Sequence, residues 1–216
     1  LLQEIYTQTA ANPSVLWDLR GAENLSPLFQ AELRNEYLKA LLDPKRDDST
    51  QTYVVFILKV LKQSALQSQL TKELRDLAAD GTRWERVRRH ALEAWVESGV
   101  TDSQTIEFLD QLNQGKISDP DEELTGILLG KLFPRAISTA QVLNYLHIPK
   151  SKILGMYQHF WAYEFPKTVP EDDLPDVLDH LAQRSDLQSL NWVEFHISRT
   201  LAALVTRGVQ VHGDQI

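Results

Sequence analysis

Apolar residues recur three or four positions apart along most of the chain, which is the spacing of one face of a helix. The clearest segment spans residues 83–98, and Gly99 follows it as a residue typical of helix ends. Another segment begins at Asp102 and stops at Gly115. We find no segment that alternates polar and apolar residues over the length of a strand. The pattern therefore predicts helices throughout.

Start and stop residues divide the chain into about ten or eleven helices joined by short turns. Segment 52–66 begins with β-branched and aromatic residues, but its length without Gly or Pro favours a buried helix. Ser138 and Gln141 form a capping box, and Asp172 or Asp173 can cap a later helix. The expected helices span 27–42, 52–66, 70–80, 83–98, 102–114, 120–132, 139–147, 151–165, 174–183 and 191–207.

Each of these helices has an apolar face that a neighbour must cover, and short turns place consecutive helices in antiparallel pairs. We therefore predict an all-α fold of stacked helix pairs, either a HEAT- or armadillo-like α-solenoid or an irregular helical bundle. Residues 118–216 carry 13 acidic and 8 basic side chains, so they hold most of the net charge of -8. We expect a HEAT-like segment over 1–117 and an acidic helical segment over 118–216 packed on it, or one continuous domain.

Composition excludes several classes of protein. The 216 residues include no Cys, which rules out a disulfide scaffold, a thiolate metal site and a cysteine nucleophile. The acidic balance argues against a general nucleic-acid binder. The longest apolar run, 53–58, is far shorter than the about 20 residues that span a bilayer, and the N-terminus does not resemble a signal peptide. We expect a cytoplasmic protein, and because Met156 is the only Met, a piece of a longer chain.

Motifs for cofactor or metal chemistry are missing from the sequence. Gly130-Lys131 lacks the spacing and the hydroxyl residue of a phosphate-binding loop, and the six His form no His-Glu-x-x-His pair. We therefore predict no catalytic residue, no metal site and no cofactor. Asp176 and His180 lie four residues apart and share a helix face, which more often indicates a surface hydrogen bond than a catalytic or metal site. The acidic run 171–173 fits the start of a helix.

Two clusters remain as candidate surfaces. The first is a basic run with Arg83, Arg86 and Arg89 beside Trp84, where arginine could bind phosphate and tryptophan could stack on a base. A solvated or salt-bridged face explains this run more simply. The second is the aromatic stretch 157–165, in which packing is the first explanation. Because five aromatics in nine residues are too many for a core alone, we expect some to be half exposed and to offer a partner surface, with Tyr157, Trp161 and Trp192 as its candidates.

Residues 86–99 resemble the second helix of a HEAT repeat, and the order of motifs after them resembles a known family. These motifs are Asp-Pro-Asp-Glu-Glu-Leu-Thr-Gly-Ile-Leu-Leu (119–129), Leu-Phe-Pro (132–134), Ser-Thr-Ala-Gln-Val-Leu (138–143), Gly-Met-Tyr-Gln-His-Phe (155–160) and Asp-Asp-Leu-Pro-Asp-Val-Leu (172–178). Together they resemble the helical region that follows the P-loop module in large bacterial NACHT- or STAND-type NTPases. Phe133 stands where that family usually has tryptophan. The resemblance covers about residues 70–183.

The resemblance implies a non-catalytic helical scaffold or sensor segment of a larger signalling or defence protein, which contacts a protein partner or other domains of its own chain. Its nucleotide-binding motifs would lie outside these residues. Two other hypotheses stay open. One is a nucleic-acid-binding helical repeat that uses Arg83, Arg86 and Arg89. The other is a small-molecule-binding or hydrolytic helical domain that uses the 159–161 region or the Asp176 and His180 pair.

Overall fold

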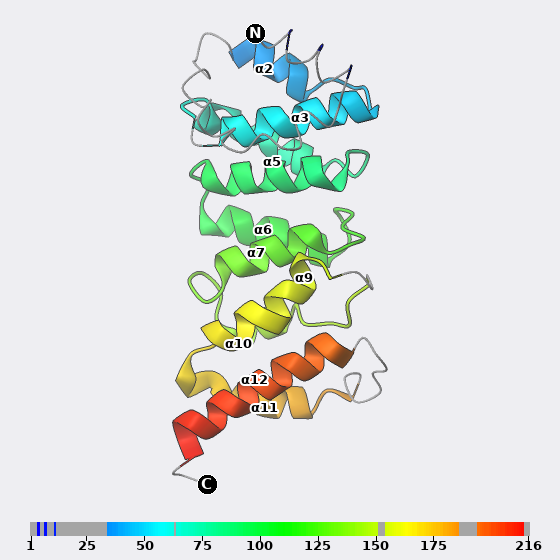
Figure 1. Cartoon of the computed structure of the whole chain (residues 1–216). Helices are drawn as coiled ribbons and strands as arrows, with labels where there is room; N and C mark the ends of the chain where they lie inside the picture. Colours follow the sequence, from blue (N-terminus) through cyan, green and yellow to red (C-terminus); the bar gives the residue numbers. More distant parts are fainter. Residues whose placement is uncertain are drawn as a thin grey trace. The chain divides into compact units, whose positions relative to one another are not determined.

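The computed structural model of the chain describes residues 4, 7, 11, 34–62, 64–150, 154–185 and 194–213. All regular secondary structure in these residues is helical, which confirms the predicted all-α fold class (Figure 1). The chain divides into two compact units, Leu1–Thr101 and Asp102–Ile216. The boundary that we predicted after residue 117 falls inside the second unit, where α6 (Asp102–Asn113) packs on α7 (Glu123–Leu132). The solenoid stays a prediction.

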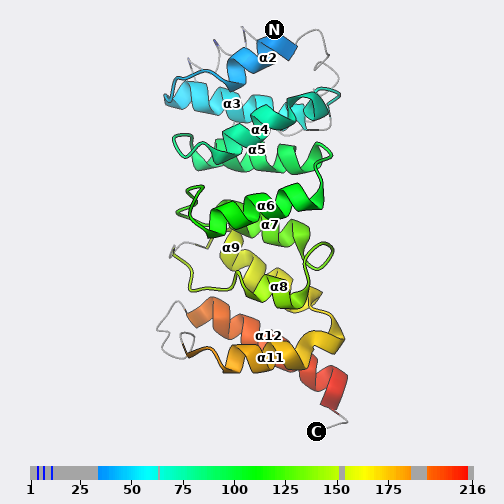
Figure 2. The same ribbon diagram turned by 180° about the vertical axis from the view of Figure 1, so that it is seen from behind.

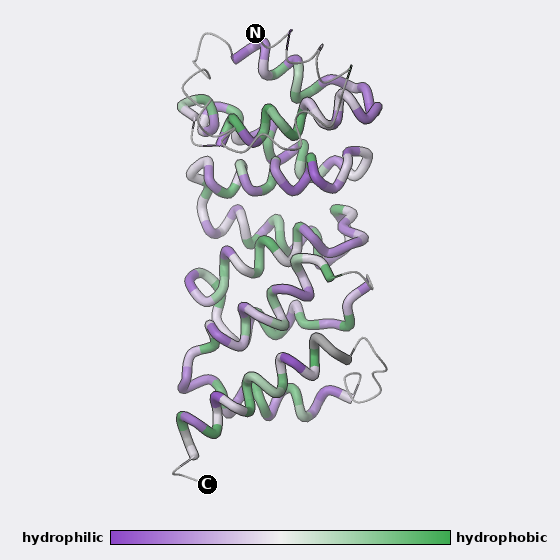
Figure 3. The backbone as a smooth tube through the Cα atoms, viewed as in Figure 1, coloured by the Kyte–Doolittle hydropathy of each residue, from purple (hydrophilic) through white to green (hydrophobic). Residues whose placement is uncertain are grey.

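The first unit contains α2 (Arg34–Leu41), α3 (Asp48–Leu61), η4 (Gln67–Leu70), α4 (Thr71–Ala79) and α5 (Glu85–Glu97). Helix α3 is the centre of this unit, and nearly all of its residues are buried. Asp47 caps its start by accepting a hydrogen bond from the Thr50 N–H at 3.0 Å. In Figure 3 hydrophobic residues fill the middle of α3, whereas hydrophilic residues recur along α5. Helix α5 packs on α3, and its buried face includes small and aromatic residues such as Ala91, Ala94 and Trp95.

The second unit contains α6, α7, α8 (Thr139–Leu143), α9 (Met156–His159), η5 (Phe160–Glu164), α10 (Phe165–Thr168), η6 (Glu171–Asp173), α11 (Leu174–Ala182) and α12 (Glu194–His212). Gly115, at φ 70°, ends the first of these helices as predicted. Helices α7 and α9 cross at Gly126, where a Cβ atom would overlap the backbone of Met156 and Tyr157. The predicted capping box of Ser138 and Gln141 is present at the start of α8, but that helix ends at Leu143 instead of residue 147.

Helices α9 and α10 are joined by a π-helical turn, η5, that the sequence analysis did not foresee. The Phe165 N–H bonds the Phe160 carbonyl five residues earlier, and Pro166 has no N–H to continue the pattern. The Trp161 carbonyl is therefore left without a partner in its own helix. Thr200 of α12 donates its hydroxyl to that carbonyl at 2.7 Å. The irregular turn thus fixes α12, which lies beside α11 in both views (Figure 2).

Candidate functional site

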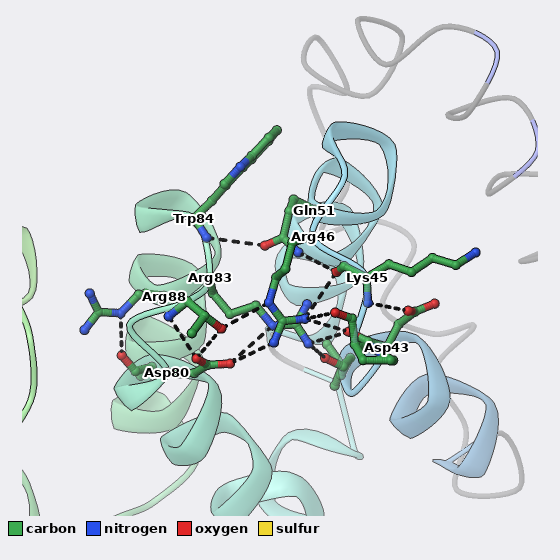
Figure 4. A network of polar contacts seen from close by, with 12 residues as sticks. Asp43, Lys45, Arg46, Gln51, Asp80, Arg83, Trp84 and Arg88 are labelled. Carbon is green, nitrogen blue, oxygen red and sulfur yellow. Dashed lines mark hydrogen bonds and ion pairs between the residues drawn. The ribbon is translucent and has the colours of Figure 1, made fainter.

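Arg83, the first residue of the predicted basic run, is a buried clamp between two loops (Figure 4). The residue is only 6% exposed, and its Nη2 group donates to the carbonyls of Leu41 at 3.1 Å and Asp43 at 2.7 Å. These carbonyls lie at the end of α2, where the helix has no further N–H groups to offer them. Burial lowers the pKa of Arg83, and the nearby Arg46 lowers it further. The guanidinium therefore supplies hydrogen-bond donors to backbone carbonyls of the first unit.

Arg46 and Asp80 form a more exposed layer over this clamp. Arg46 donates to the Pro44 carbonyl at 2.7 Å and pairs with the Asp80 carboxylate at 3.2 Å. The Asp80 carboxylate also accepts hydrogen bonds from the backbone and hydroxyl of Thr82. Burial alone would raise the pKa of Asp80, but the Thr82 hydrogen bonds and the two arginines bring it below its usual range. The positive and negative charges here compensate one another inside the unit.

The prediction of a basic patch is wrong for Arg83 and stays a prediction for Arg86 and Arg89. Arg83 cannot meet a phosphate because its guanidinium faces backbone carbonyls in the interior. Arg86 and Arg89 are half-buried. Arg88, which belongs to the same basic run, is 4% exposed and donates its Nε to the Ala78 carbonyl at 3.0 Å. Arg83, in the turn before α5, and Arg88, on α5, thus both donate to carbonyls in the interior, because a long arginine side chain can reach the end of a neighbouring helix.

A second ionic cluster lies in the C-terminal half of α5. Glu93 accepts from Lys62 at 3.2 Å and lies 3.4 Å from the Nδ1 atom of His90. Burial opposes ionisation of Glu93, but hydrogen bonds and charge from His90 and Lys62 prevail and lower its pKa to about 2. Lys62 also pairs with Glu97 at 3.4 Å. This cluster ties the end of α3 to α5.

The predicted aromatic partner surface is wrong for Tyr157 and Trp161, which are 0% and 3% exposed. They pack with Phe160 and Phe165 in the core of the second unit, where the Trp161 and Phe165 rings lie 4.7 Å apart. We expected some of the five aromatics to be half exposed, and among them only Tyr163 is not buried. The π-helical turn explains the difference, because it rotates neighbouring residues so that more than one helix face turns inward. Trp192 lies outside the described residues.

The Tyr157 hydroxyl is a buried junction of the second unit. It accepts from the His147 N–H at 2.8 Å and lies 2.9 Å from the Tyr145 carbonyl, to which it donates. Burial raises the pKa of Tyr157, and the negative charge of Glu122 adds to that effect. The Tyr145 hydroxyl in turn donates to the Asp110 carboxylate at 2.7 Å. Burial is the main cause that raises the pKa of Tyr145, and this hydrogen bond raises it further. These phenols hold loop 144–147 against α6 and α9.

Glu122 has the burial and backbone strain of a functional residue, and the sequence did not indicate this. It is 1% exposed, and its backbone adopts the left-handed conformation at φ 58°, which is uncommon for a residue with a side chain. Its carboxylate accepts hydrogen bonds from the His147 ring and, at 2.8 Å, from the Lys150 N–H. The His147 Nδ1 atom lies 2.9 Å from the Tyr145 carbonyl oxygen and 3.1 Å from the Tyr157 hydroxyl. Strained, buried acid–histidine pairs occur at active sites, but here each partner bonds to loop backbone.

No local signal in the sequence distinguishes Glu122 from its neighbours Asp121 and Glu123. All three were assigned to the start of a helix, where acidic residues are favourable. The sequence predicts that Asp119-Pro120 opens this helix, and the Asp119 carboxylate accepts from the Leu124 and Thr125 N–H groups at 3.3 and 2.9 Å. Only the fold shows that Glu122 points inward to His147, a residue 25 positions later.

The remaining predicted pairs do not form sites in the described residues. No hydrogen bond or ion pair joins Asp176, which is exposed, to His180 on the same helix. The Asp173 side chain does not cap α11 and accepts from the Thr139 hydroxyl instead. Across the described ranges, no group of three His, Asp or Glu side chains could hold a metal ion. None of the helices in these ranges combines the length and the apolar character that crossing a bilayer requires.

The outer face of α12 differs from the networks above because its side chains are exposed. Val205 and Val209 are 49% and 55% exposed and lie one turn apart, beside the exposed Ala202. Arg199 lies one turn before Ala202, and its guanidinium sits 4.4 Å from the centre of the Tyr163 ring. Exposed apolar side chains that share one helix face can contribute to an interaction surface. We therefore take this face as the candidate functional site.

Comparison of the chain with protein-family models, with curated proteins and with solved structures gave no match. The similarity to NACHT- or STAND-type NTPases thus stays a prediction from sequence motifs.

Proposed function

We propose that this chain is a helical scaffold or sensor segment that acts by presenting a surface to a protein partner or to another domain of its own polypeptide. The observation that carries this proposal is the exposed row of Ala202, Val205 and Val209 on α12. Burying two half-exposed valines on a partner would contribute about 1–2 kcal/mol to the free energy of binding. The same side chains make no such contribution while they stay in water.

The way in which the chain uses its ionisable groups also favours an interaction role. Arg83, Glu122 and Tyr157 have the burial and the altered environments that active sites use. Each of them is bonded to loop carbonyls or N–H groups, and so each has a sufficient structural role. When the function resides in an outer helix face, these interior groups serve to stabilise the fold.

We further propose that the polypeptide to which this segment belongs is a bacterial NTPase-type signalling or defence protein. The support for this step is the order of motifs over residues 70–183. The segment would transmit a trigger to the NTPase or pack against it, with no chemistry of its own. A phosphate-binding loop encoded in the same reading frame would strengthen this part of the proposal, and a reading frame without one would overturn it.

Site-specific photo-crosslinking tests the interaction role. Benzoylphenylalanine is placed at one of three exposed positions of the full polypeptide, Asp48, Ser103 or Thr206, and the native cells are irradiated. We expect at least one position to give a discrete adduct with one protein or with another domain of the chain, identified by mass spectrometry. Adducts with nucleic acid alone, or no adduct from any of the three positions, would contradict the proposal.

A further inference from the structure

From the described face of α12, we infer that it binds an amphipathic helix whose apolar row is accompanied by an acidic residue. This inference rests on the proposed function and specifies its surface and partner chemistry. The face runs from Arg199 to Val209, which is about 15 Å along the helix axis. A partner helix of about three turns matches that length.

Apolar contact comes from one side of the face. Ala202, Val205 and Val209 follow one another at i, i+3 and i+7, so they form a continuous row on the outer surface. The buried side of the same helix is formed by Ile197, Thr200 and Leu204, which face the rest of the unit. The row is narrow and made of small and β-branched side chains. Such a surface accepts the larger side chains of a partner helix, which pack into its grooves.

Charge selects the partner. Arg199 is exposed, and no carboxylate of the described residues lies within ion-pair distance of its guanidinium. Its position is fixed because it lies over Tyr163, whose ring stacks on His159 at 5.2 Å. No Asp or Glu occurs between residues 195 and 213. A fixed, unneutralised arginine beside an apolar row is complementary to an acidic side chain, and a pre-positioned guanidinium binds a carboxylate with little loss of entropy.

A second copy of the chain and a lipid surface fit the face less well. A second copy in two-fold symmetry would bring the Arg199 charges of both rows to the same interface, and residues 195–213 contain no Asp or Glu to neutralise them. Helices that lie on membranes carry several Lys or Arg residues and large apolar side chains, whereas this face offers one exposed arginine and small aliphatic groups. Both occupants are nevertheless tested below.

The test uses the full chain and two designed helical peptides of about 14 residues, which share a leucine row and differ only in flanking Glu or Lys. We expect the Glu peptide to bind and the Lys peptide to bind at least about tenfold more weakly. Arg199→Glu should weaken the Glu peptide at least about tenfold, while Lys116→Glu, an equal charge change in the loop after α6, should not. The joint variant Val205→Ala and Val209→Ala should weaken binding of the Glu peptide without adding charge.

Circular dichroism and melting temperature confirm that each variant is folded. Failure of the Glu peptide to bind, or equal binding of both peptides, would overturn the inference. So would concentration-dependent self-association that the valine variant abolishes, or binding to anionic phosphatidylserine vesicles that Arg199→Glu abolishes. If the photo-crosslinked adducts persist in the α12 variants, the proposed function stands and only this surface is excluded. If no position gives adducts while the Glu peptide binds, the surface stands and the proposed role in cells fails.

Discussion

Each of the two units buries charged side chains against backbone groups, and the sign of the charge differs between the units: arginine in the first and glutamate in the second. In the first unit the Arg83 guanidinium donates to the Leu41 and Asp43 carbonyls at the end of α2. In the second unit the Glu122 carboxylate accepts from the Lys150 N–H and from the His147 ring. The sign of each buried charge matches the backbone groups that lack a partner. A helix end leaves carbonyls free and attracts a cation, whereas a loop with free N–H groups attracts an anion.

Arg83→Ala should break the first of these two arrangements with the largest effect. It leaves the Leu41 carbonyl without a donor, removes one of the two donors to the Asp43 carbonyl and deletes a buried side chain, so we expect the free energy of unfolding to fall by about 2–4 kcal/mol. Arg83→Lys keeps the charge but loses the forked geometry and should cost about half as much. Urea denaturation followed by circular dichroism measures both. Lys45→Ala changes an exposed residue of the loop that Arg83 contacts; it is the control and should change stability by less than about 0.5 kcal/mol.

Glu122→Gln should weaken the second arrangement by a smaller amount. The amide oxygen can still accept from the Lys150 N–H, but the charged contact with His147 is lost, so we expect a cost of about 1–3 kcal/mol. Asp121→Asn makes the same chemical change at the exposed neighbouring residue and should cost less than about 0.5 kcal/mol. Hydrogen exchange should show faster exchange of the Lys150 amide in Glu122→Gln alone. Equal effects of the two variants would show that the buried acid has no special role.

The Glu93 cluster sharpens the comparison because it is ionic but only partly buried. The pKa of Glu93 is lowered to about 2 in the folded state, below its value in an unfolded chain. Its contribution is therefore fully present above about pH 4.5 and is lost as the pH falls toward 2. We expect Glu93→Gln to reduce the acid dependence of unfolding in this range by about 2 kcal/mol. An unchanged slope of stability against pH between 4.5 and 2 would rule out this ionic role.

Local sequence patterns predicted the helices but not the contacts between them. The expected helix 83–98 is present as α5, and the box of Ser138 and Gln141 caps α8, because both depend on residues within one or two turns. The Arg83 clamp and the Glu122–His147 pair join residues 42 and 25 positions apart, and no periodicity encodes such a distance. Pro166 could have indicated the missing N–H that produces the π-helical turn, and with it the burial of Tyr157 and Trp161.

The candidate site was missed for a related reason. Aromatic residues attracted attention as the strongest binding groups, yet a core takes them first because they bury the largest area. The row on α12 consists of alanine and valine, which are residue types that are most often buried, so their identity did not indicate an exposed face. Its exposure follows only from how α12 is turned against the π-helical turn by Thr200 and Arg207.

The account rests on a separation between interior charges that hold the units and an outer face that binds. Photo-crosslinking from Thr206 tests this separation most directly when the adduct yield is compared in Glu93→Gln and in the joint variant Val205→Ala and Val209→Ala. We predict that the yield persists in Glu93→Gln, although its acid stability changes, and falls at least about tenfold in the valine variant, although its melting temperature at neutral pH is nearly unchanged. An adduct that survives the loss of both valines would contradict the account.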